Sequence, residues 1–114
     1  EPVDNLLLSN VFRSGVNALM KTLSRELMED GIRTNCIAPG LISTDRLEKI
    51  EKSTAESTGK NPNEVRKQMQ AGVPMGRYGS PEEFGRMGAF LLSPAASYIN
   101  GESIQGDGGL ARSV

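Results

Sequence analysis

A long helical pattern, followed almost at once by a strand pattern, most restricts how this chain can fold. Residues 6–29 place apolar side chains at three- and four-residue steps, the period of one helix face. Residues 32–40, "IRTNCIAPG", then alternate as in a half-buried strand until Pro39 and Gly40 break the pattern. A strand that follows a helix after so short a turn predicts an α/β fold with a parallel sheet.

The predicted helix over residues 6–29 carries two neighbouring stripes that are suited to packing. Asp4 or Asn5 can cap its start, and Gly31 can supply the left-handed residue that ends it. Two stripes fit either a helix that packs against the core and a second subunit, or a helix with one wide core face. Periodicity alone leaves both alternatives open. The first stripe, expected to be buried, consists of Phe12, Val16, Leu19, Leu23 and Leu27, and the second, of smaller residues, of Val11, Gly15, Ala18 and Thr22.

Residues 45–72 differ from the rest of the chain because they are highly charged and offer few apolar anchors. We expect two short helices joined by "STGKNP", weakly packed and mobile. Such a segment fits a lid over a binding site, and it also fits a solvated surface excursion. Its apolar anchors are Leu47, Ile50, Val65 and Met69.

The last third of the chain begins with a strong helix-start signal. "SPEE", residues 80–83, reads as a capping box with proline at the first helical position, and the helix is expected to continue to about Leu92. Asn100 and Gly101 predict a turn, "ESIQ" predicts a short final strand, and "GDGG" predicts a turn or a disordered tail. The helix residues expected to face the core are Phe84, Met87, Phe90 and Leu91.

Composition excludes several classes of function. The chain has 114 residues, enough for one small domain, and its 13 basic and 14 acidic residues provide no excess of positive charge for nucleic acid. It has no histidine and one cysteine, Cys36, which rules out a structural zinc site, a Ser-His triad and an internal disulfide. We find neither a signal-peptide pattern nor an apolar run near the ~18 residues of a membrane span. These features lead us to expect a cytoplasmic protein.

Residues 39–44, "PGLIST", are the candidate ligand loop. Ligands bind beyond the carboxyl ends of the strands in open parallel sheets, and this stretch follows the predicted strand. Gly40 would let a ligand approach the backbone, and Thr44 offers a hydroxyl at a helix start, where anionic groups are favoured. An ordinary strand-to-helix turn is the alternative.

The order of these segments carries a family resemblance. The chain resembles the carboxy-terminal half of a short-chain dehydrogenase/reductase and is similar to the 3-oxoacyl-carrier-protein reductase branch. The resemblance covers nearly the whole chain and rests on "LMKTLSREL", "GIRTNCIAPGLIST", "VPMGRYGSPEEFGRMGAFLLSPAASYINGESI" and "DGG", in that order.

The resemblance implies the carboxy-terminal part of a Rossmann-type, doubly wound parallel sheet, with residues 45–72 as the lid over the substrate. Residues 1–114 would then be one half of a single domain, and the family's glycine-rich phosphate loop and catalytic serine would lie in the other half. The implied activity is the NAD- or NADP-dependent reduction or oxidation of a small carbonyl or alcohol substrate, usually in a homotetramer. By the same resemblance, the residues contacting the nicotinamide and pyrophosphate are Pro39, Gly40, Ile42 and Thr44.

The resemblance also assigns a role to "LSNVFR", residues 8–13. The family places a proton-donating tyrosine and, four residues later, a ribose-binding lysine on this helix, at the positions of Ser9 and Arg13. Arginine keeps the charge and hydrogen bonds of lysine but does not release a proton, whereas serine is a far weaker acid than a phenol.

Three interpretations follow from this substitution. The protein is an active reductase that obtains its proton from elsewhere or through a water relay. Alternatively it has lost or changed its chemistry and serves as a cofactor-binding or oligomerising subunit, or it is an interaction module that only uses the fold. Tyr78 is not expected to replace the tyrosine, because it lies before the capping box and outside the long helix.

Overall fold

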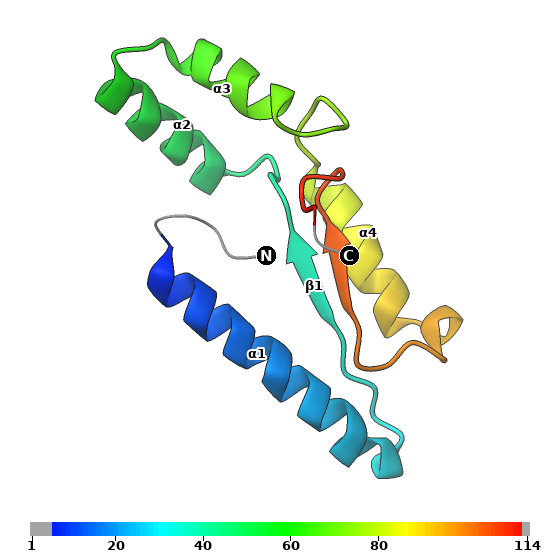
Figure 1. Ribbon diagram of the computed structural model, residues 1–114. Helices are drawn as coiled ribbons and strands as arrows, with labels where there is room; N and C mark the ends of the chain where they lie inside the picture. The colour runs from blue at the N-terminus through cyan, green and yellow to red at the C-terminus, as the bar shows by residue number, and fades with distance from the viewer. Residues whose placement is uncertain (1–5, 113–114) are drawn as a thin grey trace. The chain divides into compact units, whose positions relative to one another are not determined.

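The computed structural model describes residues 6–112 and confirms the α/β fold. Its helices and strands follow one another in the order expected from the sequence (Figure 1). The elements are α1 (Leu7–Glu26), the 3-10 turn η1 (Leu27–Asp30), β1 (Cys36–Pro39), α2 (Asp45–Thr58), α3 (Pro62–Ala71), α4 (Pro81–Leu92), the 3-10 turn η2 (Pro94–Ala96) and β2 (Ser103–Gly106).

β1 and β2 pair in a two-stranded sheet. The Cys36 amide donates to the Glu102 carbonyl at 2.8 Å, and the Gly40 amide donates to the Gly106 carbonyl at 3.1 Å. Both partners advance by the same number of residues in the same direction, so the pair is parallel, as predicted. β1 begins at Cys36 and not at residue 32 as expected. The Thr34 amide donates to the side chain of Asn100 at 3.0 Å instead of to a neighbouring strand.

The chain divides into two compact units. Of the described residues, the first consists of 6–38 with 87–105, and the second of 39–86 with 106–112.

In the first unit, polar contacts tie α1 to the segment before β2. Lys21 Nζ donates to the Gly101 carbonyl at 2.7 Å, and Asn100 Nδ2 donates to the Ser24 carbonyl at 2.7 Å. Gly101 has a φ of 76°, and a Cβ there would lie 2.6 Å from Ser24 Oγ. Only glycine therefore fits this predicted turn, and the buried residues of α1 are Met20 and Ser24.

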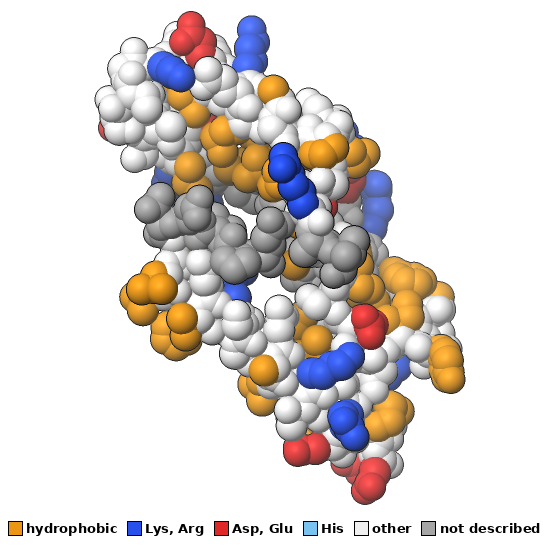
Figure 2. Space-filling view, viewed as in Figure 1, with side chains coloured by type: hydrophobic (Ala, Val, Ile, Leu, Met, Phe, Trp, Pro, Cys, Tyr) orange, Lys and Arg blue, Asp and Glu red, His pale blue; other side chains and the backbone are white. Residues whose placement is uncertain are grey.

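The prediction of a buried stripe along α1 is wrong for three of its five residues, while the other two, Leu23 and Leu27, are half-buried. Phe12, Val16 and Leu19 are 71%, 56% and 57% exposed, and hydrophobic side chains gather on the surface over the first half of this helix (Figure 2). The second stripe is exposed too. Periodicity identifies an apolar face correctly, but the described residues leave this face uncovered.

The ends of α1 match the sequence signals in part. Leu6 occupies the N-cap position and its side chain makes no capping hydrogen bond, while the candidate caps Asp4 and Asn5 lie outside the described residues. Gly31 follows η1 with a φ of 73°, as expected for a left-handed helix end.

Arg33 caps the far end of α4 from within the first unit. Its guanidinium donates to the Leu91 and Ser93 carbonyls at 3.0 and 3.3 Å, and to the Ile99 carbonyl at 3.1 Å. The last carbonyls of a helix have no partner within it, so a cation at this position satisfies them and opposes the helix dipole. Leu91 is the one predicted core residue of α4 that is buried, whereas Phe90 is exposed.

In the second unit, α2 and α3 form the predicted helical pair. Thr44 caps α2, Gly59 ends it with a φ of 67°, and Asn61 caps α3 ahead of Pro62. The pair buries a small set of side chains, namely Leu47, Ala55 and Val65, whereas the predicted anchor Ile50 is 42% exposed. Residues 45–72 therefore have a small apolar contact of their own, and both their role as a lid and their mobility stay predictions.

Gly40 and Asp107 approach closely in the same unit. A Cβ on Gly40 would lie 2.5 Å from the Asp107 Cα, so the residue must be glycine. The Asp107 carboxylate accepts from the Gly109 and Ala111 amides at 2.9 and 2.8 Å, which also lowers the pKa of Asp107. Of the two alternatives for "GDGG", a turn and a disordered tail, the structure has the turn.

Alanine substitutions at two glycines test this packing in the complete protein. Gly40→Ala should lower the free energy of unfolding by roughly 1–3 kcal/mol, because the Asp107 backbone must move. Gly85→Ala is the matched control: a Cβ there meets nothing within 4 Å. Since Gly85 lies within α4, its replacement should stabilise by roughly 0.5–1 kcal/mol. Thermal melting measures both, and a Gly40→Ala variant as stable as wild type would contradict the packing.

Candidate functional site

The loop at residues 39–44 continues from the end of β1 and pairs with Gly79. The Gly79 amide donates to the Leu41 carbonyl at 3.0 Å, and the Gly79 carbonyl accepts from the Ser43 amide at 2.9 Å. These bonds form an isolated parallel bridge between Ile42 and Gly79. The backbone of this loop is therefore fixed by pairing, which an ordinary strand-to-helix turn does not require.

Thr44 closes the loop and starts α2. Its hydroxyl accepts from the Leu47 amide at 3.4 Å and donates to the Ile42 carbonyl at 3.3 Å. The hydroxyl thus serves as the helix cap, and the side chain remains exposed at the N-terminus of a fourteen-residue helix. Of the other predicted cofactor residues in the loop, Pro39 is exposed, whereas Gly40 and Ile42 are half-buried.

Arg77 and Glu83 lock the segment that carries Gly79. The Arg77 guanidinium donates to both Glu83 carboxylate oxygens, at 2.9 and 2.7 Å. Glu83 Oε2 also accepts from the Ser80 amide at 2.8 Å, and Ser80 Oγ accepts from the Glu83 amide at 3.1 Å, so the predicted capping box is confirmed. The Arg77 hydrogen bond and the Ser80 amide lower the pKa of Glu83 to about 2.

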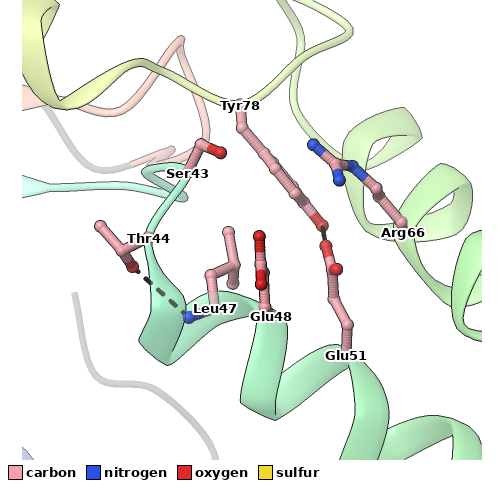
Figure 3. A pocket seen from close by; sticks show the side chains of 7 residues that line it. All are labelled: Ser43, Thr44, Leu47, Glu48, Glu51, Arg66 and Tyr78. Carbon is pink, nitrogen blue, oxygen red and sulfur yellow. Dashed lines mark hydrogen bonds between the residues drawn. The ribbon is translucent and has the colours of Figure 1, made fainter.

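A small pocket in the second unit gathers polar side chains from α2, α3 and the segments next to them (Figure 3). The Tyr78 hydroxyl points at α2 and donates to Glu51 Oε1 at 2.7 Å, while the Arg66 guanidinium of α3 lies 5.6 Å from the centre of the Tyr78 ring. The lining residues are Ser43, Thr44, Leu47, Glu48, Glu51, Arg66 and Tyr78.

Tyr78 has a raised pKa in this environment. Burial, together with the hydrogen bond to Glu51, raises the pKa of Tyr78 to about 12. A general acid works best with a pKa near the working pH, so this shift is in the wrong direction. That Tyr78 does not replace a catalytic tyrosine stays a prediction, with which this shift agrees.

Ser9 and Arg13 lie together on α1, as their spacing predicts. Arg13 Nε donates to Ser9 Oγ at 3.1 Å, Ser9 is half-buried and Arg13 is exposed. This bond engages one guanidinium donor, and an arginine carries four further N–H donors. The pair therefore combines a hydroxyl with a cation that retains capacity for a ligand, and its role in catalysis or cofactor binding stays a prediction.

The predicted site residues fall into two sets. Ser9 and Arg13 belong to the first unit, whereas the loop at residues 39–44 belongs to the second. Sequence analysis missed the pairing of Tyr78 with Glu51, because the two residues are 27 positions apart and no local pattern connects them. It identified Glu83 through the capping box, but not the fork that Arg77 makes with it.

The described residues offer neither a candidate metal site nor a candidate membrane span. Within residues 6–112, no group of three or more histidine, cysteine, aspartate or glutamate side chains is placed to hold a metal ion. None of the helices in this range is both long enough and apolar enough to span a bilayer.

Comparison with known proteins identifies the class. A family model described as enoyl-(acyl carrier protein) reductase matches residues 3–111. The chain belongs to the short-chain dehydrogenase/reductase family. It is 33% identical, over all of its 114 residues, to the NADPH-dependent reductase BacG of Bacillus subtilis, and 38% identical over 99 residues (87% of this chain) to the 3-oxoacyl-(acyl-carrier-protein) reductase FabG of Chlamydia trachomatis.

Solved structures show the same fold. The crystal structure of YwfH, an NADPH-dependent reductase involved in bacilysin biosynthesis, matches the whole chain with a TM-score of 0.91 and 35% identity. An NADPH-bound short-chain oxidoreductase from Pseudomonas aeruginosa, described as containing an atypical catalytic center, matches the whole chain with a TM-score of 0.84 and 28% identity.

The chain spans less than half of the proteins that it resembles. It covers 44% of BacG, 36% of FabG, 43% of YwfH and 42% of the Pseudomonas oxidoreductase.

Acid sensitivity tests the Arg77–Glu83 fork. The pKa of Glu83 falls from its ordinary value of 4.5 to about 2 on folding, so the ionised carboxylate stabilises the protein above pH 4.5. This contribution should diminish between pH 4.5 and about 2, as the folded protein takes up the proton. The complete protein should therefore unfold at higher urea than Glu83→Gln at pH 6, and the gap should narrow towards pH 2. Glu82→Gln, at an exposed neighbouring carboxylate, is the control, and a gap at pH 6 no larger than that control's would contradict the fork.

Proposed function

We propose that the complete protein is an NADPH-dependent reductase of small carbonyl substrates. The observation that carries this proposal is the bonded Ser9–Arg13 pair, at the helix positions where the family resemblance places its tyrosine and lysine. The names of BacG and YwfH support NADPH as the cofactor. The Pseudomonas oxidoreductase supports the idea that an unusual catalytic centre is compatible with NADPH binding in this family.

In this proposal the chain supplies one part of a cofactor site. Arg13 holds the nicotinamide ribose with its remaining donors, and the loop at residues 39–44 contacts the nicotinamide and pyrophosphate. The rigid pairing of that loop with Gly79 fits a surface that must hold a flat ring in one orientation. The bound cofactor supplies a hydride, which is chemistry that no side chain of the protein provides.

Ser9 completes the proposed site. Its hydroxyl is too weak an acid to replace a phenol, so it orients the substrate carbonyl or a water that relays the proton. Arg13 cannot release a proton at neutral pH, but its positive charge stabilises the negative charge that develops on the carbonyl oxygen. A 3-oxoacyl thioester is the substrate class to test first, because FabG is among the relatives.

Two further proposals concern the setting of the reaction. We propose that residues 45–72 form the lid over the substrate and that the glycine-rich phosphate loop belongs to another part of the complete protein. We also propose a cytoplasmic homo-oligomer, with the exposed apolar stripes of α1 at its interfaces; the reducing cytosol suits the free thiol of Cys36.

Substitutions at the pair test the proposed cofactor site. Arg13→Ala in the complete protein should weaken NADPH binding about ten- to a hundredfold, because hydrogen bonds to a charged group contribute roughly 1.5–3 kcal/mol. Ser9→Ala should bind NADPH nearly like wild type and slow turnover of the 3-oxoacyl substrate. Titration of NADPH fluorescence beside a ketone-reduction assay measures both effects.

Arg25→Ala is the matched control, since Arg25 is an exposed arginine in the last turn of the same helix. Wild-type NADPH affinity in Arg13→Ala would remove the pair from the cofactor site. NADPH binding without turnover of carbonyl substrates would instead favour a cofactor-binding subunit. Ser9→Tyr combined with Arg13→Lys rebuilds the family's pair, and a gain in turnover would show that the native site is chemically weakened.

The proposed interface on α1 is tested by charge. Gly15→Glu or Ala18→Glu should dissociate the oligomer, since each places a carboxylate within the second stripe. Asn17→Glu adds the same charge on the opposite side of the helix from that stripe and should leave the assembly intact. Light scattering measures the mass, and an unchanged mass in both stripe variants would reject the interface.

A further inference from the structure

Three consecutive residues, 77–79, each bind a different element of the second unit. Arg77 binds Glu83 at the start of α4, Tyr78 binds Glu51 on α2, and Gly79 binds the backbone of residues 41–43. We call residues 77–79 the junction. One short stretch of chain thereby contacts the lid, the loop at residues 39–44 and a helix terminus.

The contact between the junction and the loop consists of two backbone hydrogen bonds. Both backbone groups of Gly79 pair with the loop, to Leu41 and to Ser43. A Cβ on Gly79 would lie 2.9 Å from Ile42 Cδ1, the end of a flexible side chain, so it is the two backbone bonds that fix this contact. The loop and the junction therefore move together.

The contact between the junction and the lid depends on one buried hydrogen bond. Glu51 is 6% exposed, and its carboxylate accepts from the Tyr78 hydroxyl at 2.7 Å. A buried carboxylate without a partner carries a large desolvation penalty. Breaking the hydrogen bond between Tyr78 and Glu51 would therefore be costly, and the bond ties α2 to the junction. Arg66 of α3 lies over the same ring, and one aromatic side chain thus contacts both lid helices (Figure 3).

Arg77 keeps the junction in place from the other side. Besides its two bonds to Glu83, it donates to the Tyr78 carbonyl at 3.0 Å. The backbone of Tyr78 is thereby fixed to the start of α4. Its side chain can therefore position α2 and α3 from an anchored backbone.

We propose that Tyr78 is a positioning residue, which sets the lid helices α2 and α3 relative to the loop at residues 39–44 through its hydrogen bond to Glu51. This inference rests on the proposed function, because it assigns the lid's position to substrate binding. Tyr78 touches neither the cofactor nor the substrate in this scheme. It determines how far the lid opens while the loop stays fixed.

Hydrogen exchange on the complete protein tests the hold on the lid without any ligand. Tyr78→Phe keeps the ring under Arg66 and removes only the hydroxyl. Exchange of the amides in residues 45–71 should become about tenfold faster, the scale of losing one hydrogen bond to a charged group. Tyr98→Phe is the matched control, because Tyr98 is fully exposed, and it should exchange like wild type.

Kinetics separate positioning from a structural role. Tyr78→Phe should raise the KM for the carbonyl substrate severalfold and leave the dissociation constant for NADPH unchanged, because the loop keeps its bonds to Gly79. Glu51→Gln keeps an oxygen that accepts from the phenol, so it should show a smaller effect in both assays. If the hydrogen bond between Tyr78 and Glu51 were merely structural, Tyr78→Phe would lower the melting temperature and leave the KM unchanged.

The outcomes distinguish the inference from the function on which it rests. Wild-type exchange in residues 45–71 of Tyr78→Phe would overturn the inference, whatever the activity. Faster exchange with an unchanged KM would also overturn it, since the lid would then be loose without consequence for substrate. If the wild-type protein neither binds NADPH nor reduces carbonyls, the proposed function fails and the inference falls with it.

Discussion

The parallel pairing of β1 with β2 is the constraint on which the rest of this chain depends. Cys36 bonds to Glu102 and Gly40 to Gly106, although each pair is far apart in the sequence. Everything between the strands, including α2, α3 and α4, is a long excursion that must return in register. Two glycines permit the return: Gly101 turns tightly beside Ser24 ahead of β2, and Gly40 leaves room for the backbone of Asp107 beyond it.

Hydrogen bonds and ion pairs hold much of the remaining structure in place. Few side chains of the described residues are buried, and none of the large ones is completely enclosed. Arginine guanidinium groups hold segments together here, a role that apolar packing has in many domains. Arg33 satisfies the carbonyls at the end of α4, and Arg77 binds the carboxylate of Glu83 at its start. The second unit therefore owes its arrangement at the loop to directional bonds, which define positions more sharply than apolar contact.

Local signals in the sequence predicted most of the elements. The capping box at residues 80–83 and the left-handed Gly31 each depend on neighbours within a few positions, and each is present. The expected strand from residue 32 began late because Thr34 bonds Asn100, a partner that no local rule identifies. The stripe on α1 was correctly identified as apolar, but the described residues leave most of it exposed.

The candidate site likewise combines contacts that local spacing predicts with contacts that only the tertiary fold creates. The spacing of Ser9 and Arg13 fixes their contact on a helix, so their hydrogen bond could be predicted. The hold of Gly79 on residues 41–43 and the bond between Tyr78 and Glu51 could not, because they join segments that only the tertiary fold brings together. Family resemblance supplied the assignment of a cofactor loop, whereas the structure supplied the reason why that loop is rigid.

The most direct test of this account is a crystal structure of the complete protein with NADPH bound. The account predicts that the nicotinamide ribose lies within hydrogen-bond distance of the Arg13 guanidinium and that the nicotinamide rests against the loop at residues 39–44, still paired with Gly79. A cofactor bound elsewhere, with Arg13 facing solvent and the loop making no contact with the nicotinamide, would contradict it.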